Sequence, residues 1–322
     1  MFGDWRPSAT LPVLQKRAAL LACIRHFFAQ KKVLEVETPA MSQCGVTDPY
    51  LDNIPVHYNH SDYPHLYLQT SPEYAMKRLL AAGSGPIYQM GKAFRNAERG
   101  KRHNPEFTML EWYRPGFSLI QLMEEVGGLV AECSKTLNVT LPAPQIKTYE
   151  QVFYDVTEIN PHIASAEALK SLAEARHIDV VGELSRDEWL DLLMTHIIEP
   201  TLQGLIFLTD YPASQAALAQ KKMVRSYWVA ERFELYYNGI ELANGYFELV
   251  DATEQSLRFS ADLRLRGKLN KPNMLPDTRL LQALIAGMPS CAGVALGVDR
   301  LLMAILGFST IDDVIAFPLE KA

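Results

Sequence analysis

The chain has 322 residues and a mass of 36.2 kDa, and 48% of its residues are hydrophobic. This length suits one large domain or two ordinary ones with a sizeable core. The formal net charge of −6 has the wrong sign for a protein whose main task is to wrap a polyanion. The four cysteines lie far apart without a CxxC pair, which argues against a zinc site and a disulfide framework.

Membrane and export signals are absent from the sequence. The longest apolar stretch, residues 283–308, is broken by Pro289 and by the pair Asp299 and Arg300. The N-terminus lacks the basic start and unbroken apolar run of a secretory signal. We therefore expect a soluble cytoplasmic protein that does not bind a membrane.

Hydrophobic periodicity and turn residues predict helices and strands along the whole chain. The expected elements, in chain order, are a helix over 14–31, a short strand before 39, a strand over 67–70, a helix from 72, strands over 87–94 and 107–113, a helix over 118–137, a helical insertion over 145–204, strands over 205–208, 231–237 and 240–249, helices over 252–268 and 277–287, a strand over 293–296 and a helix from 299. Thr70 or Ser71 can cap the helix from 72. Asn238 and Gly239 are typical of a two-residue hairpin turn. We predict a single α+β domain, residues 1–322, organised on an antiparallel sheet.

One hairpin-sized segment, residues 94–113, indicates nucleotide binding. Arg95 follows an apolar strand, and the loop after it carries four further basic or titratable side chains, Arg99, Lys101, Arg102 and His103. Phe107, Glu111 and Tyr113 then share one face of the returning strand. Guanidinium groups bind phosphate oxygens in bidentate fashion, so this loop can grip a triphosphate. The alternative is an exposed hairpin whose charges are merely solvated.

Two other basic clusters lie at residues 221–225 and 264–271. Charges at such spacing usually form the solvated face of a helix, and we expect that here.

Three segments in order resemble motifs 1, 2 and 3 of the class II aminoacyl-tRNA synthetases. They are KVLEVETP at 32–39, the hairpin with Arg95, and GVALGVDR at 293–300. Each alone is a weak signal, whereas their joint occurrence is highly specific. The resemblance covers nearly all of the chain from Leu14 onward. It implies a class II catalytic core that uses ATP and Mg²⁺, and a homodimer formed through motif 1. A monomer is the alternative.

Within that class, three phrases are similar to the lysine enzyme. These are TSPEY at 70–74, RHNPEFTMLEWY at 102–113 and FELYYNGIELANGYFEL at 233–249. The resemblance implies that Glu73 binds an amino group near the backbone end of the substrate, while Glu111 and Tyr113 hold the distal ammonium. The other implied substrate contacts are Ser71, Asn244, Glu248 and Ala295. The alternative for Glu111 is a structural ion pair with Lys92.

The resemblance also implies how ATP binds. Arg95 would bridge the α-phosphate and the amino acid carboxylate, and Arg300 would cover adenine while reaching the γ-phosphate. Phe107 would stack on adenine. The remaining ATP contacts would be Asn96, His103, Asn104, Glu241, Leu242 and Gly297. The implied magnesium ligands are Glu241 and Glu248, which a regular strand would place on opposite faces, so a bulge near Asn244 and Gly245 is expected.

Two departures separate the chain from the lysine enzyme. About 30 residues precede motif 1 and about 20 follow motif 3, whereas a small nucleic-acid-binding barrel needs on the order of 100. We therefore expect no anticodon domain and no stable tRNA binding. Ala295 also replaces the glycine of the family pattern GLGIGIDR, and its methyl group should make the amino acid pocket shallower.

With these departures the chain resembles the truncated paralogs of the lysine enzyme. These ligases activate (R)-β-lysine with ATP and transfer it to the ε-amino group of a lysine on elongation factor P. A free-standing synthetase that acylates an RNA is one alternative. A non-catalytic regulatory paralog is the other, and it should have lost Arg95, Glu241 or Arg300, all of which are present.

Overall fold

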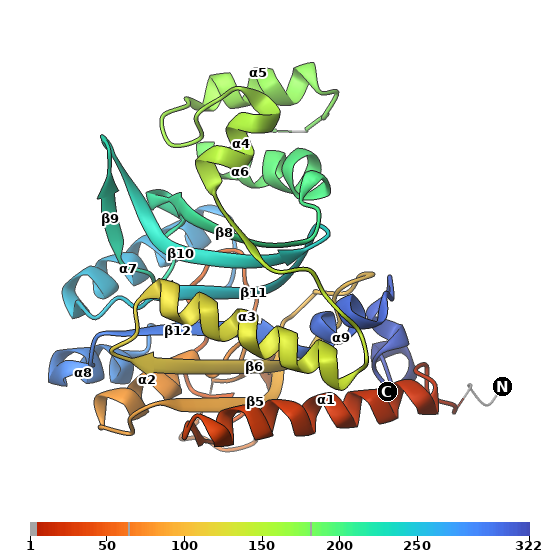
Figure 1. The fold of residues 1–322 in the computed structure, drawn as a ribbon. Helices are drawn as coiled ribbons and strands as arrows, with labels where there is room; N and C mark the ends of the chain where they lie inside the picture. The colour runs from red at the N-terminus through yellow and green to blue at the C-terminus, as the bar shows by residue number, and fades with distance from the viewer. Residues whose placement is uncertain (1–4, 64, 181) are drawn as a thin grey trace. The chain divides into compact units, whose positions relative to one another are not determined.

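The computed structural model describes residues 5–63, 65–180 and 182–322 (Figure 1). It contains two compact units, unit 1 with Met1–Thr140 and Leu249–Ala322, and unit 2 with Leu141–Glu248. The single domain expected from the sequence stays a prediction. No helix in the described part of the chain is long and apolar enough to cross a membrane.

The longer strands of unit 1 and their edge partner are β1 (Leu34–Glu35), β5 (Ile87–Phe94), β6 (Glu106–Pro115) and β12 (Cys291–Gly297). β5 and β6 form the hairpin that the sequence predicted. β1 pairs parallel with β5, whereas β5 with β6 and β6 with β12 are antiparallel. The apolar run before Arg95 ends at Phe94 as expected.

Two helices of unit 1, α1 (Leu11–Gln30) and α3 (Leu119–Thr136), contact one another and lie along this hairpin (Figure 1). Ser118 caps α3 with a reciprocal capping box. Phe28 of α1 contacts the rings of Tyr88 and Trp112, and the indole of Trp112 donates to Glu125 of α3. The face of β6 that carries Trp112 is therefore covered, and Glu111 and Tyr113 belong to the other face.

The rest of unit 1 consists of short elements and peripheral helices. They are a small antiparallel sheet of β2 (Met41–Ser42), β4 (Leu66–Leu68) and β3 (Pro55–Val56), the helices α2 (Glu73–Ala81), α7 (Ala252–Lys268), α8 (Thr278–Gly287) and α9 (Val298–Leu306), and the turns η4 (Ile311–Asp313) and η5 (Leu319–Lys321). The expected cap of α2 is corrected: Pro72 takes the N-cap position without a side-chain bond. The hydroxyl of Ser71 instead accepts from the backbone N–H of Glu73.

Unit 2 is also built on strands. They are β7 (Gln145–Thr148), β8 (Leu205–Pro212), β9 (Lys221–Val224), β10 (Tyr227–Tyr237) and β11 (Ile240–Phe247). β7 and β8 pair parallel, and the other pairs are antiparallel. The predicted hairpin is confirmed, because Asn238 and Gly239 have φ values of 47° and 71° between β10 and β11.

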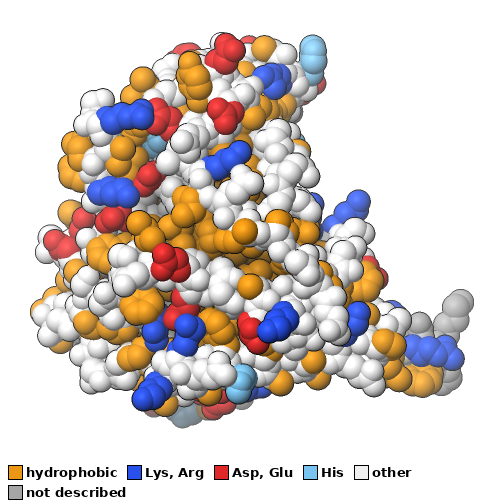
Figure 2. Space-filling view, in the orientation of Figure 1, with side chains coloured by type: hydrophobic (Ala, Val, Ile, Leu, Met, Phe, Trp, Pro, Cys, Tyr) orange, Lys and Arg blue, Asp and Glu red, His pale blue; other side chains and the backbone are white. Residues whose placement is uncertain are grey.

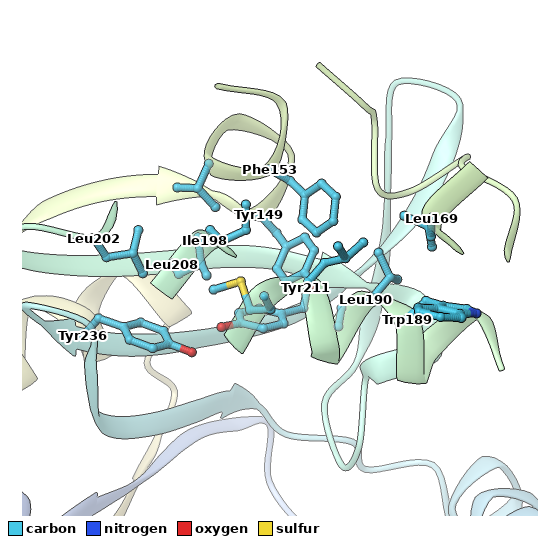
Figure 3. Close-up of a cluster of buried hydrophobic side chains, with 14 of the residues drawn as sticks. Tyr149, Phe153, Leu169, Trp189, Leu190, Ile198, Leu202, Leu208, Tyr211 and Tyr236 are labelled. Carbon is cyan, nitrogen blue, oxygen red and sulfur yellow. The ribbon is translucent and has the colours of Figure 1, made fainter. Parts of the chain in front are cut away.

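The predicted insertion over 145–204 packs its apolar side chains against the strands of unit 2. After β7 it contains α4 (Tyr149–Thr157), α5 (Ala166–Ala175), α6 (Arg186–Leu193), a π-helical turn η1 (Met194–Ile198) and η2 (Glu199–Thr201). Figure 3 shows Phe153 and Leu190 of these helices gathered with Tyr211 and Tyr236 of the strands in one buried cluster. The apolar half of the insertion is therefore core. The expectation of a wholly helical insertion is wrong at its start, where β7 lies.

The first basic cluster does not lie on a helix, and the second is a solvated helix face only in part, because Arg264 and Lys268 of α7 are exposed whereas Arg266 is not. Residues 221–224 form strand β9, and Lys222 lies 3.0 Å from Asp210. Arg266 of α7 is only 1% exposed and donates to the carbonyl groups of Asp48 and Leu51. Burial of a guanidinium is tolerated here because carbonyl oxygens satisfy it.

Candidate active site

Glu111 is the centre of a polar cluster on the face of β6 opposite to Trp112. Its side chain is only 2% exposed, yet Ser71 donates to one carboxylate oxygen and Tyr113 to the other, both at 2.6 Å. Burial, followed by the negative charge of Glu73, raises the pKa of Glu111 to about 7. Lys92 pairs at 3.0 Å with Glu106, on the other face of the hairpin, so the alternative ion pair between Lys92 and Glu111 is wrong.

Sequence reasoning missed a buried cation beside this cluster. Lys77 is 1% exposed, and its ammonium lies 2.7 Å from Glu73, one helical turn earlier in α2. The i,i+4 spacing was the signal that could have revealed it. Two carboxylates and one lysine leave an excess of negative charge, which suits an ammonium group of a substrate.

A second missed residue is Gln89 of β5, directly opposite Glu111. Its side-chain oxygen is buried and has no hydrogen-bond partner among the described residues. An unpaired buried acceptor is costly unless a ligand donates to it. The side-chain oxygen of Gln89 is therefore a candidate acceptor for an N–H group of the substrate.

β12 lines the other side of Glu111 with small residues. Ala295 is registered against Glu111, Gly293 against Tyr113, and Gly297 against Met109. Residues directly opposite on antiparallel strands share a face, with Cβ atoms about 5 Å apart. The methyl group of Ala295 is therefore a neighbour of the Glu111 side chain.

Arg95 has the geometry of an anion-binding residue. Its guanidinium lies 5.2 Å from the ring centroid of Phe107 and 3.7 Å from Glu98. Its Nε is buried and has no hydrogen-bond partner in the described part of the chain. A buried guanidinium donor without an acceptor fits a phosphate or carboxylate oxygen.

His103 and Arg300, which the sequence predicts to bind ATP, contact one another. A guanidinium nitrogen of Arg300 lies 2.6 Å from the ring Nε2 of His103, and another donates to the carbonyl of Arg102. Partial desolvation and the nearby cations, Arg300 first, lower the pKa of His103 to about 4. The ring is therefore neutral at pH 7 and accepts from Arg300, so the positive charge for a phosphate comes from the arginines.

Asn96 and Asn104, the other predicted ATP contacts of this loop, form hydrogen bonds within unit 1. The side chain of Asn104 donates to the carbonyl of Glu106 and accepts from the backbone N–H of Leu319. The backbone N–H of Asn96 donates to the carbonyl of Asp52. Asn104 thus fixes the shape of the loop, and its part in ATP binding stays a prediction.

Unit 2 contains the expected bulge, although at another position. Glu241 pairs with Tyr236 and Ala243 with Leu235, so Leu242 is the extra residue. The insertion at Leu242, and not near Asn244 and Gly245, changes the alternation of side chains. Glu241 and Asn244 consequently fall on one face of the strand.

Glu241 lies within β11, whereas Glu248 follows the end of that strand and forms an isolated bridge with Ala219. Glu241 and Glu248 as a pair of magnesium ligands stay a prediction. Carboxylate oxygens are ligands that Mg²⁺ accepts, with substrate phosphates and water completing the shell.

Glu234 and its neighbour Arg232 escaped the sequence analysis. Tyr211 and Tyr236 each donate to Glu234 at 2.6 Å, and Arg232 pairs with it as well. Arg232 also donates to the side-chain oxygen of Asn244 at 3.2 Å. Because arginine only donates, the amide oxygen of Asn244 is the atom that faces Arg232.

A model of the family described as tRNA synthetases class II (D, K and N) matches residues 2–321. The match spans the three motifs and both compact units. It confirms the class II resemblance, and the observed mixture of strands flanked by helices confirms the predicted α+β fold class.

Proposed function

Because the chain belongs to the class II tRNA synthetase family of the D, K and N enzymes, we propose that it is a ligase that activates (R)-β-lysine as its adenylate and transfers it to a lysine of elongation factor P. Membership of the family supports the general activity, which is ATP-dependent activation of an amino acid. The choice of amino acid and acceptor is the specific part of the proposal.

The observation that carries the proposal is the environment of Glu111. A buried carboxylate is held by Ser71 and Tyr113, a second carboxylate, Glu73, lies nearby, and Ala295 stands directly opposite. Two carboxylates favour a substrate with two ammonium groups. The Ala295 methyl takes volume that glycine would leave open, which favours a substrate whose amino group sits one carbon further from its carboxylate.

The first chemical step forms the adenylate. An oxygen of the amino acid carboxylate attacks the α-phosphorus of ATP, the bond to the β-phosphate oxygen breaks, and pyrophosphate leaves. Arg95 would neutralise charge on both reactants through its unpaired Nε, and Arg300 would bind the leaving phosphates. Glu241 and Glu248 are the residues predicted to hold a magnesium ion, which would supply further charge neutralisation.

The second step transfers the acyl group. The neutral ε-amine of the acceptor lysine attacks the carbonyl carbon of the adenylate, AMP leaves, and the amine proton passes to solvent. An amide results. Acidic and basic side chains are interspersed on the face shown in Figure 2, and the net charge is −6, which fits a protein acceptor better than RNA.

A homodimer through α1 and β1 is part of the proposal. Leu34 of β1 is 56% exposed and Leu11 of α1 is 70% exposed, and the proposal places both elements at the interface. Sedimentation equilibrium tests it, and a monomer at micromolar concentration contradicts this part.

The decisive experiment measures both steps with purified protein. Pyrophosphate exchange with α-lysine and with each β-lysine enantiomer should be fastest for the (R)-β form. Elongation factor P incubated with ATP and β-lysine should then gain the mass of one β-lysyl group. Efficient charging of tRNA with lysine, together with no mass gain on elongation factor P, contradicts the proposal and favours an RNA acceptor. Absence of any exchange favours the non-catalytic alternative.

A further inference from the structure

Residues 311–321 contact the loop over 95–105 at several points, and we call them the C-terminal strap. The backbone N–H of Ile311 donates to the carbonyl of Lys101 at 2.8 Å. The backbone N–H of Leu319 donates to the side chain of Asn104 at 3.2 Å. Strap and loop are thus joined near both ends of the strap.

Arg99 makes the charged contacts between the two segments. Its Nε donates to Glu320 at 2.7 Å, and one terminal nitrogen donates to Asp312 at 2.9 Å and to Glu320 at 2.8 Å. The other terminal nitrogen donates to the carbonyl groups of Gly100 and His103. These contacts use all five N–H donors of a guanidinium. Arg99 therefore has no donor left for a phosphate, contrary to the expectation that it helps to grip a triphosphate.

His103 connects this network to Arg300, one of the residues predicted to bind ATP. Arg99 holds the backbone carbonyl of His103, and the ring of the same residue contacts Arg300. A loop that must order when it binds a ligand loses affinity, because fixing each residue costs about 1 kcal/mol or more. Prior attachment of the loop to the strap removes part of that cost.

We propose that Asp312 and Glu320 are positioning residues, which act through Arg99 to hold the 95–105 loop in the conformation that binds the phosphates of ATP. This inference rests on the proposed use of ATP. It assigns a role in nucleotide affinity to two acidic side chains that touch no substrate.

The first test is steady-state pyrophosphate exchange with Asp312→Ala, Glu320→Ala and the double variant. The double variant should raise KM for ATP about threefold to tenfold, as expected for loss of two partly exposed ion pairs in a network. The rate at saturating ATP and the KM for the amino acid should not change. Glu174→Ala, which removes the exposed partner of Lys170, is the matched control and should leave all three values unchanged.

Arg99→Ala separates the strap from direct phosphate binding. If Arg99 acts by holding the loop, adding this change to the double variant should raise KM for ATP by no more than about threefold, the loss expected for its remaining contacts with the carbonyl groups of Gly100 and His103. An additional tenfold rise would mean that Arg99 contacts ATP itself and would overturn the inference. Unchanged or lower KM for ATP in the double variant would overturn it as well.

Hydrogen exchange gives a readout that does not need turnover. Backbone amides of residues 95–105 should exchange faster in the double variant than in the parent, while those of α5 should not. Equal protection of the loop in both proteins contradicts the inference. A parent protein that shows no ATP-dependent exchange refutes the proposed function, and loop protection then still shows whether the strap orders the loop.

Discussion

Ala295 and Glu111 lie directly opposite one another on β12 and β6, which places a methyl group beside a buried carboxylate. The two residues are 184 positions apart in the chain (295 − 111), so antiparallel pairing alone brings them together. This contact connects one substitution in a family pattern with the recognition of an ammonium group.

Replacement of Ala295 by glycine should relax discrimination against α-lysine, because it restores the volume next to Glu111. Loss of one methyl group is worth about 1 kcal/mol, so the ratio of kcat/KM for β-lysine over α-lysine should fall about fivefold. Pyrophosphate exchange with each amino acid measures this ratio. Ala292→Gly is the matched control, since Ala292 lies on the same strand but pairs with Arg114 on the covered face. Equal ratios in the parent and Ala295→Gly would remove the pocket argument.

Amino acid binding should strengthen as pH rises through about 7. The pKa of Glu111 is raised to about 7 in the free protein, and an ammonium group prefers the ionised carboxylate. Binding should therefore release a proton near pH 6.5, which calorimetry in two buffers of different ionisation enthalpy detects. Glu111→Gln should abolish the release and weaken binding about 10-fold to 100-fold. The same proton release in Glu111→Gln would exclude Glu111 as its source.

The same group makes folding stability depend on pH. A carboxyl whose pKa is higher in the folded than in the unfolded protein stabilises the fold fully below its unfolded value, near 4.5. That contribution is lost as pH rises through about 7. Urea unfolding between pH 5 and 8 should show this decline in the parent and a smaller one in Glu111→Gln. Parallel pH profiles would contradict the prediction.

Substitution of Lys77 by methionine should destabilise the protein by about 3 kcal/mol. It leaves Glu73 without its ion-pair partner at the edge of a buried cluster. Because Lys77 also lowers the pKa of Glu111, its removal should shift the pH midpoint of amino acid binding upward. Lys170→Met, at an exposed i,i+4 pair, serves as control and should change the free energy of unfolding by less than about 0.5 kcal/mol. Equal losses in the two variants would show that Lys77 has no special role.

Gly239→Ala should destabilise the β10–β11 hairpin by about 2 kcal/mol or more. Gly239 has a φ of 71°, and a Cβ there would lie 2.6 Å from the carbonyl oxygen of Glu199. Gly128→Ala in α3 is the matched control, because a Cβ there meets nothing within 4 Å and alanine is the better helix former. Chemical unfolding should therefore show a loss for the first variant and none for the second. A hairpin that tolerates alanine at 239 would mean that the backbone relaxes there.

Local patterns predicted most elements of this fold. The apolar run before Arg95, the Asn238 and Gly239 turn, and the start of a helix at Ser118 each lie within a few residues of the structure that they specify. Patterns failed where the partner lies far along the chain. We expected the basic residues of β9 to lie on a helix, because the residues of β9 alone do not show that this segment pairs with β10.

The candidate site divides in the same way. Motif order and residue type were enough to identify the class of the protein and to name Glu73, Arg95, Glu111 and Arg300 as candidates. Only the tertiary structure showed that Lys77 is buried against Glu73, that the bulge falls at Leu242, and that Arg99 is held by Asp312 and Glu320. Strand register and burial decided these points, and both arise from contacts between residues distant in sequence, whose energies no local pattern contains.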